Sequence, residues 1–287
     1  LFDRITALSA PGSRVATEVG PTQEWWQEPV RYYYLVLQTG DGTFARRFGI
    51  LVMILCLLVA IFRLMSSHRP PGVAVAPIWR LIAVMLGTMF FIAFTPTKWT
   101  HHFGVYACIG AALAAATAAM MAPPLLRSRR NRTFFAAAVL LVTGVAAAGT
   151  NMWWYVGSYG IPWWDRPVSV AGLKLSWVVL ALAGLTALVG LWYHFRDDYV
   201  DEPVRTGFDR KGLDRLKFSP VPVISGLVIV FMLLTFAKGA WEQRDSWSWA
   251  KSNARALTGD TCGLANDVLV EVDPAASMAA PAAVDGR

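Results

Sequence analysis

Charged residues are scarce in this chain, and their scarcity argues against a soluble fold. Asp, Glu, Lys and Arg make up 16% of the 287 residues, whereas about a quarter of a typical soluble domain is charged. Hydrophobic residues make up 55%, and the mean hydropathy is +0.44. Because lipid is the solvent that such a composition suits, we predict an integral membrane protein.

Several signatures of soluble proteins are also missing. The sequence contains no Gly-rich phosphate-binding loop, no Gly-x-Ser-x-Gly nucleophile elbow and no Cys-x-x-Cys pair. Its basic residues do not gather on a soluble segment, which argues against a nucleic-acid-binding protein. Of the three cysteines, Cys56 and Cys108 lie in apolar stretches, and Cys262 is expected outside, available to pair with a partner.

What the sequence does have is a series of long apolar stretches. A helix needs about 20 mostly apolar residues to cross about 30 Å of hydrocarbon. We therefore predict an all-α, polytopic transmembrane helical bundle with about six spans. Small residues are dense in the third and fourth stretches, so these two are expected to pack inside the bundle. The six stretches are Phe48–Met65, Ile78–Phe94, Gly104–Leu126, Thr133–Gly149, Leu173–Tyr193 and Pro220–Ala237.

The loops between these stretches predict the orientation of the bundle. Residues 127–132 carry four Arg, and residues 196–217 carry six Lys or Arg. Both loops are predicted to be cytoplasmic because cytoplasmic loops are enriched in basic residues. Alternation then places residues 95–103, residues 150–172 and everything after Lys238 outside. The pair Arg46 and Arg47 falls on the outer side and disagrees, but two strongly basic loops outweigh one pair.

One outer segment, TPTKWTHHF, gathers polar groups where an apolar stretch ends. Lys98 and His101 could hold the phosphate of a lipid head group, and Trp99 could stack on a sugar or a prenyl chain. A purely structural turn around Pro96 is an equal alternative, with Lys98 snorkelling and a histidine capping the next helix. A metal site at His101 and His102 is a weaker third, because no acid or cysteine lies nearby.

Three separated motifs resemble one known family. They read FTPTKWTHHFGVYA (Phe94–Ala107), NMWWYVGSYGIPWW (Asn151–Trp164) and TGDTCGLANDVLVE (Thr258–Glu271). Together, and in this order, they look like the Emb arabinosyltransferases of mycobacteria and related actinobacteria. The resemblance covers most of the chain, from Glu24 to Asp273. It implies the C-terminal transmembrane portion of a membrane glycosyltransferase with the GT-C fold.

The resemblance also implies an activity and its partners. Family members transfer arabinofuranose from decaprenyl-phosphoryl-arabinose to the arabinan of arabinogalactan or lipoarabinomannan, and they are targets of ethambutol. By resemblance we expect a pentosyltransferase that crosses the cell membrane several times, with a periplasmic active side. A homo- or hetero-dimer with a paralogue is expected, and no nucleic acid. No cofactor is expected beyond the lipid-linked donor; a divalent cation would be compatible but nothing indicates it.

The family's motif assigns roles to individual residues. Trp99 and His101 match the Trp and the first His of the KWTHH motif, which line the donor and drug pocket, and Lys98 and His102 accompany them as substrate-binding residues. The family's catalytic base is an Asp in a large periplasmic loop that precedes this region. Because this chain shows no such acidic motif, we predict no catalytic residue in it and no activity when it is expressed alone.

The apolar stretches and the resemblance together suggest a division of the chain. Residues 1–47 are predicted to be an interfacial or periplasmic segment and residues 48–237 the transmembrane bundle. Residues 238–287 are predicted to be a periplasmic lead-in, with a flexible tail, to a carbohydrate-binding domain that is missing here.

Two functions of other classes compete with the transferase. A transporter or channel would place ionisable residues inside the spans, and the predicted spans are nearly free of them. A non-catalytic membrane scaffold would bind no ligand at residues 99–102.

Overall fold

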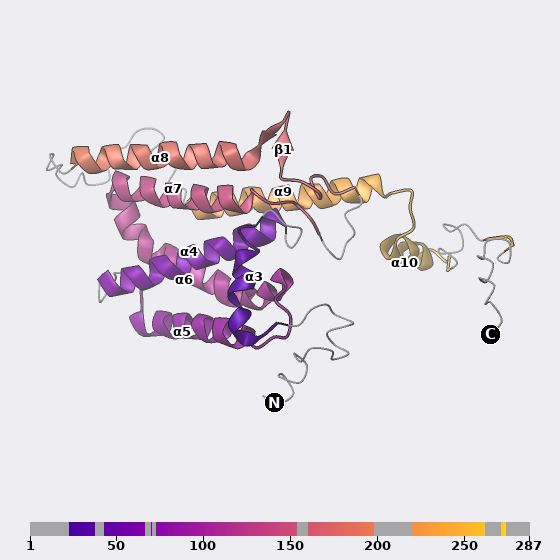
Figure 1. Cartoon of the computed structure of the whole chain (residues 1–287), viewed down its shortest axis with the longest axis horizontal. Coiled ribbons are helices and arrows are strands. Elements are labelled where there is room, and N and C mark those ends of the chain that lie inside the picture. The colour runs from indigo at the N-terminus through magenta and orange to yellow at the C-terminus, as the bar shows by residue number, and fades with distance from the viewer. Residues whose placement is uncertain are drawn as a thin grey trace, which may run out of the picture.

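Six long helices lie side by side in the part of the chain that the structure describes, and successive helices run in opposite directions (Figure 1). The computed structural model describes residues 23–37, 43–66, 70, 73–153, 160–197, 220–261 and 271–273. The long helices are α4 (Phe44–Ser66), α5 (Val75–Ile92), α6 (Ala107–Arg127), α7 (Arg129–Ala146), α8 (Leu175–Asp197) and α9 (Pro220–Glu242). The shorter elements are η1 (Trp25–Gln27), α3 (Pro29–Tyr33), η2 (Thr100–Tyr106), α10 (Trp249–Leu257) and the antiparallel strands β1 (Ser169–Val170) and β2 (Leu173–Lys174).

Five of the described helical segments are long and apolar enough to cross a membrane. The all-α membrane bundle is therefore confirmed, but with five such segments where the sequence predicted about six. The predicted span 133–149 corresponds to α7, which is not among the five. This helix begins with Arg129, Arg130 and Arg132, so its apolar part is short. The five segments are Phe44–Ser66, Val75–Ile92, Thr100–Met121, Leu175–Arg196 and Pro220–Glu242.

The first long helix begins four residues before its predicted start. The hydroxyl of Thr43 accepts a hydrogen bond from the backbone N–H of Arg46 at 3.1 Å, as an N-cap residue does. Helix α4 therefore starts at Phe44 and includes both Arg46 and Arg47. These two arginines belong to the bundle itself and are not part of a preceding loop.

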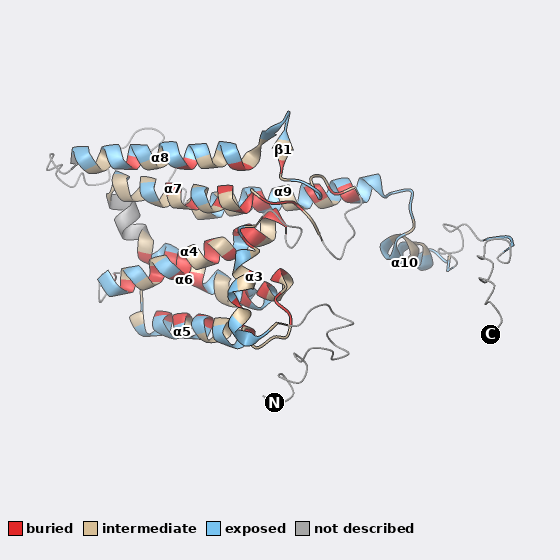
Figure 2. Cartoon of the chain, viewed as in Figure 1, coloured by how far each residue is buried: buried red, intermediate tan, exposed pale blue. Residues whose placement is uncertain are grey.

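Helix α4 lies at the centre of the bundle. It packs against α5, α6, α7 and α9, and its inner face supplies a large share of the core (Figure 2). Helices α6 and α7 each pack against α4, against one another and against at least one further helix. The dense small residues of α6 and α7 fit these positions because they let backbones approach closely. Large apolar side chains remain exposed on α5, α8 and α9, as expected for helices that face lipid.

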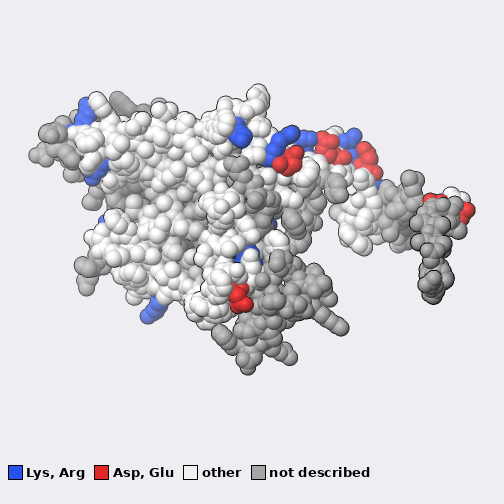
Figure 3. All heavy atoms as spheres, viewed as in Figure 1, with Lys and Arg blue, Asp and Glu red and all other residues white. Residues whose placement is uncertain are grey.

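The two ends of the bundle carry different helix termini and connecting elements. The C-terminal ends of α4, α6 and α8 lie at the end where α5 and α7 begin, whereas η2 and β1 lie at the opposite end (Figure 1). This alternation is the one that the predicted orientation requires. The flank between the ends is largely uncharged in the view of Figure 3, and basic residues lie toward the ends.

Candidate functional site

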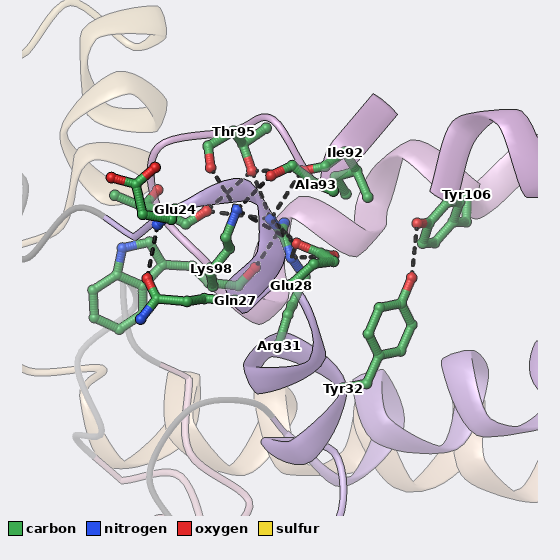
Figure 4. A network of polar contacts seen from close by, with 12 residues as sticks. Glu24, Gln27, Glu28, Arg31, Tyr32, Ile92, Ala93, Thr95, Lys98 and Tyr106 are labelled. Atoms are coloured by element: carbon green, nitrogen blue, oxygen red, sulfur yellow. Dashed lines mark hydrogen bonds and ion pairs between the residues drawn. The ribbon is translucent and has the colours of Figure 1, made fainter. Parts of the chain in front are cut away.

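The turn that follows α5 is built around a buried arginine. Arg31 of α3 is fully buried, and one of its Nη atoms donates to the hydroxyl of Thr95 at 2.6 Å and to the carbonyl oxygens of Ile92 and Thr97, each at 3.2 Å (Figure 4). Its side chain also forms an ion pair with Glu28 at 3.0 Å. A single guanidinium thus satisfies carbonyls at the C-terminal end of α5, where cations are favoured.

Lys98 supports the same turn from inside. Its ammonium donates to the carbonyl oxygens of Ala93 at 2.6 Å and Thr95 at 2.9 Å, and it lies 3.7 Å from Glu28 (Figure 4). Its side chain is 1% exposed. Burial lowers the pKa of Lys98 and raises that of Glu28, while the attraction between the two charges opposes both shifts. Lys98 therefore neither snorkels nor points out of the turn, and these contacts hold the backbone of the predicted site.

The described residues before α4 pack on this turn, and they belong to the segment that the sequence predicts to be interfacial or periplasmic. The ring of Trp25 stacks on Phe94 with centroids 6.1 Å apart. The hydroxyl groups of Tyr32 and Tyr106 lie 3.1 Å apart, and the Tyr32 ring contacts Phe103 at 5.2 Å. Residues of η1 and α3 therefore contact both the turn after α5 and the helix η2 that leads into α6. The sequence showed this segment only as a run of aromatic residues, in which Glu28 and Arg31 carried no separate signal.

Of the predicted binding residues, Trp99 is the N-cap of the short helix η2, and His101 and His102 lie in its first turn. Trp99 is half-buried, and its carbonyl oxygen accepts from Arg31 at 3.5 Å. The His101 and His102 rings meet edge to face with centroids 4.3 Å apart. The structure thus brings Trp99 and both histidines together at one end of the bundle, whereas the ammonium of Lys98 turns into the protein.

His101 lines a cavity of about 400 Å³ between α4, α6 and α9. Its walls are mostly small or apolar, with Gly49 and Met53 on α4 and Gly110 on α6 among them. Arg46 lies on the same wall as Gly49, and its guanidinium donates to the hydroxyl of Thr100 at 3.0 Å. In the sequence, Arg46 stands out only as an exception to the charge rule for loops. Arg46 and His101 line the same cavity because α4 and η2 pack side by side, a contact between distant segments that the sequence does not reveal.

Hydrogen bonds hold together the two described ends of the second motif, residues 151–153 and 160–164. The backbone N–H of Asn151 donates to the carbonyl oxygen of Trp163 at 2.9 Å, and its side-chain amide donates to that of Pro162 at 3.2 Å. The indole of Trp163 donates in turn to the carbonyl oxygen of Ser169 at 2.8 Å. Trp163 has a φ of 61°, a backbone conformation that is uncommon for a bulky residue and that these bonds hold in place. Residues 154–159 lie outside the described residues.

The described residues include no group of three or more His, Cys, Asp or Glu side chains that could hold a metal ion. Cys56 and Cys108 are free cysteines, and Cys262 lies outside the described residues.

Comparison with known proteins identifies relatives over nearly the whole chain. Residues 2–196 match the family described as "Mycobacterial cell wall arabinan synthesis protein", and residues 233–287 match the "EmbC C-terminal domain". The chain is 40% identical over 279 residues to "Probable arabinosyltransferase B" of Mycolicibacterium smegmatis. The matched region covers 97% of this chain and 25% of that protein. It is 37% identical over 282 residues to "Probable arabinosyltransferase A" of Mycobacterium tuberculosis, covering 97% of this chain and 26% of that protein.

A solved structure gives the same result for the fold. The cryo-EM structure of arabinosyltransferase EmbB from Mycobacterium smegmatis matches with a TM-score of 0.62 and 36% identity, over 72% of this chain and 19% of the other. The chain spans about a quarter of the length of the curated relatives it matches. The C-terminal domain match begins at residue 233, within α9 and slightly before the predicted boundary at 238.

Proposed function

Because the chain belongs to the family of mycobacterial cell wall arabinan synthesis proteins, we propose that it forms the donor-binding membrane region of an arabinosyltransferase. The reaction is the transfer of arabinofuranose from decaprenyl-phosphoryl-arabinose to cell-wall arabinan, at the periplasmic side of the cell membrane. The relatives' names support the reaction type. The donor, the acceptor and a dimer with a paralogue belong to the proposal.

The observation that carries this proposal is the position of His101. It lies at the end of an apolar bundle and lines a cavity that reaches between membrane-spanning segments. A polyprenyl-linked donor needs this combination, because its chain stays in hydrocarbon while its phosphate and sugar reach the aqueous boundary. Trp99 lies two residues before His101 and supplies a flat aromatic surface at the same end, suited to a sugar or an isoprene unit.

The proposed chemistry gives His101 a defined task. During transfer, the bond between C1 of arabinose and the phosphate oxygen breaks, and its electron pair stays on the phosphate. The acceptor hydroxyl forms the new bond to C1 and gives its proton to a base, a role that we assign to no residue of this chain. A histidine that donates to the phosphate accelerates the reaction only if that hydrogen bond strengthens as negative charge grows.

The other two predicted site residues receive different tasks in this proposal. Lys98 keeps its ammonium on Ala93, Thr95 and Glu28, so it positions the loop rather than contacting the phosphate. His102 packs against the ring of His101 and fixes its orientation. The binding surface then consists of Trp99 and His101.

The test is donor binding and transfer by the full-length protein in membranes, with His101→Ala and Trp99→Ala beside wild type. We expect each substitution to weaken the affinity for decaprenyl-phosphoryl-arabinose by about tenfold or more, the loss of about 1.4 kcal/mol. His194→Ala is the matched control because His194 contacts Arg130 at 3.1 Å on helices α7 and α8, away from the cavity. Unchanged donor affinity and turnover in both site variants would refute the assignment.

A further inference from the structure

Helix α10 exposes its apolar side and covers its polar side. At helical spacing, Lys251, Ser252 and Arg255 gather on one side of the helix, and all three are half-buried. The opposite side carries Asn253 and five apolar residues, and all six are exposed. The five apolar residues are Trp249, Ala250, Ala254, Ala256 and Leu257. A surface helix of a soluble protein shows the reverse arrangement, so the apolar side of α10 is expected to contact something other than the described residues.

Local signals fix both ends of α10. The hydroxyl of Ser248 accepts a hydrogen bond from the backbone N–H of Lys251 at 3.1 Å, as an N-cap residue does. At the other end Gly259 has a φ of 94°, and the backbone N–H of Asp260 donates to the carbonyl oxygen of Arg255 at 3.1 Å, as in a Schellman motif. The sequence therefore specifies this helix and the directions of its two sides.

The preceding helix α9 marks a membrane boundary close to α10. Helix α9 is long and apolar enough to cross a membrane, and one of its faces carries an exposed apolar stripe that ends at Trp241. Charged residues begin at the same level, with the exposed ion pair of Lys238 and Glu242 and with the guanidinium of Arg244, 4.6 Å from the centroid of the Trp241 ring. Trp beside charged residues is typical of the head-group level. The stripe consists of Leu227, Val230, Leu234 and Trp241.

The connection from α9 to α10 is short and turned. It consists of six residues, 243–248, which would span only about 20 Å even if they were fully extended. Hydrogen bonds shorten it further, since the N–H of Arg244 donates to the carbonyl oxygen of Trp241 at 3.3 Å and that of Ser246 to Gln243 at 3.0 Å. Helix α10 accordingly lies just past the C-terminal end of α9 (Figure 1), and much of it is exposed (Figure 2).

We propose that α10 lies in the head-group layer of the membrane, with Trp249, Ala254 and Leu257 turned toward the acyl chains. Amphipathic helices of this kind bury their apolar side about 5–10 Å into the boundary between head groups and acyl chains. The exposed stripe of α9 gives continuity, because the lipid that covers Trp241 extends to a helix that begins eight residues later. Trp249 suits this layer, since an indole ring has an apolar body and a polar N–H.

Lipid fits this face better than a protein partner does. The helix has nine residues and is therefore about 14 Å long, and three of its five exposed apolar residues are alanines. A specific protein interface buries about 800 Å² on each partner, which a short face of small side chains does not provide. A lipid surface needs no matching shape.

This placement gives α10 a task beyond the transfer reaction. Residues 233–287 match the "EmbC C-terminal domain", so α10 lies within the first part of that domain. A helix held in the head-group layer fixes the start of the domain against the membrane. It does so at the end of the bundle that carries η2, where Trp99 and His101 lie (Figure 1).

The experiment measures the depth of α10 in the full-length protein in phosphatidylcholine nanodiscs. A fluorophore is attached to Leu257→Cys in a background whose exposed thiols, Cys108 among them, are replaced by Ser. Bromine atoms on the acyl chains quench the fluorophore if it contacts lipid, and iodide quenches it if it contacts water. We expect lipid quenching close to that at Leu234→Cys in α9, and iodide quenching severalfold below that at Asp245→Cys, an exposed site in the connection.

A charge on the apolar side should lift the helix from the membrane. With the fluorophore at Ala254→Cys, Trp249→Glu is expected to shift the balance from bound to released α10 by about tenfold or more, because a carboxylate resists transfer out of water. Lipid quenching then falls and iodide quenching rises. Trp249→Leu is the matched control, since it keeps the side apolar and should leave both values near those of wild type. Ala254→Cys also decides the matter if Leu257→Cys fails to fold.

Two outcomes would overturn the proposal. Iodide quenching at both probe positions as strong as at Asp245→Cys, without lipid quenching, would place the apolar side in water. Weak quenching by both agents would mean that protein covers this side, either the rest of the C-terminal domain or a second copy of the chain. Neither outcome bears on the proposed transfer of arabinose, because these variants leave Trp99 and His101 unchanged.

Discussion

Arg47 of α4 caps the C-terminal end of α7 by donating from Nε to the carbonyl oxygen of Ala146 at 3.0 Å. The same guanidinium donates to the carbonyl oxygen of Thr150, and its side chain is fully buried. The last carbonyls of a helix lack partners within the helix, and its negative dipole end favours a cation. Arg47 therefore joins α4 to the C-terminal end of α7, a role in the bundle that the charge rule for loops does not consider.

Replacement of Arg47 by Met should destabilise the bundle. The substitution preserves much of the apolar stem but leaves the carbonyl oxygens of Ala146 and Thr150 buried without their donor, at a cost of about 1–3 kcal/mol. Thermal unfolding of the purified protein in detergent measures the change. Arg80→Met on α5 is the control, because Arg80 is exposed and should shift the melting temperature little. Equal melting temperatures for Arg47→Met and wild type would contradict the capping role.

Gly149 leaves the room that the Arg47 guanidinium occupies. A Cβ built at Gly149 would overlap the guanidinium, which cannot move aside while it is buried and bonded to two carbonyls. We expect Gly149→Ala to cost about 1–3 kcal/mol through overpacking. In Arg47→Met the same glycine substitution should cost less, so the double-mutant cycle should be non-additive. Additive costs would show that Gly149 and Arg47 act independently.

The sequence allowed the class of fold to be predicted, together with the position of the candidate site residues at the end of an apolar helix, because both depend on local patterns. Apolar stretches predicted the membrane bundle, and the KWTHH motif placed Trp99 and His101 at one end of it. The direction in which a side chain points depends on residues far away in the sequence, so the sequence did not predict which way the Lys98 side chain points. Lys98 reads as an exposed cation, but its partners include Glu28, 70 positions earlier in the chain. Arg46 violates the charge rule for loops in the sequence, and only the packing of η2 beside α4 reveals its hydrogen bond to Thr100.

Lys98→Met should weaken the turn without abolishing a phosphate contact. The substitution removes the donor of the Ala93 and Thr95 carbonyls and leaves Glu28 with Arg31 as its remaining basic partner. We expect a loss of stability of about 1–3 kcal/mol, and any loss of donor affinity should accompany it. His101→Ala is the comparison, since it should lower donor affinity with little change in melting temperature. Full stability with lost donor binding in Lys98→Met would instead support a direct phosphate contact.

Glu28 should make the stability of this turn depend on pH. Burial raises its pKa above the ordinary 4.5, against the opposing pull of Arg31 and Lys98. A raised carboxyl pKa contributes stability that is fully present below pH 4.5 and is lost as pH rises through the folded-state pKa. The melting temperature of wild type relative to Glu28→Gln should therefore fall as pH rises from 4.5 toward neutrality. Asp165→Asn, which changes an exposed carboxylate, is the control. If the melting temperature of wild type relative to Glu28→Gln rose with pH, the predicted direction of the pH dependence would be wrong.

Gly144 sets the distance between α7 and α8, which correspond to the fourth and fifth predicted spans. A Cβ at Gly144 would lie 2.7 Å from both Cγ and Cδ2 of Leu180 and 3.2 Å from its backbone nitrogen. Because backbone as well as side chain blocks the space, Gly144→Ala should force the helices apart at a cost of about 1–3 kcal/mol. Gly184→Ala, in open space on α8, should be neutral or slightly stabilising.

The contact with Leu180 can be separated from the contact with the backbone. Leu180→Ala removes the two side-chain atoms nearest to the new Cβ, so Gly144→Ala should cost less in that background than in wild type. Some cost should remain, because the backbone nitrogen of residue 180 stays in place. Thermal unfolding of the four proteins of this cycle measures both parts. A coupling energy of zero would mean that α7 and α8 relax freely, and that small residues do not determine their spacing.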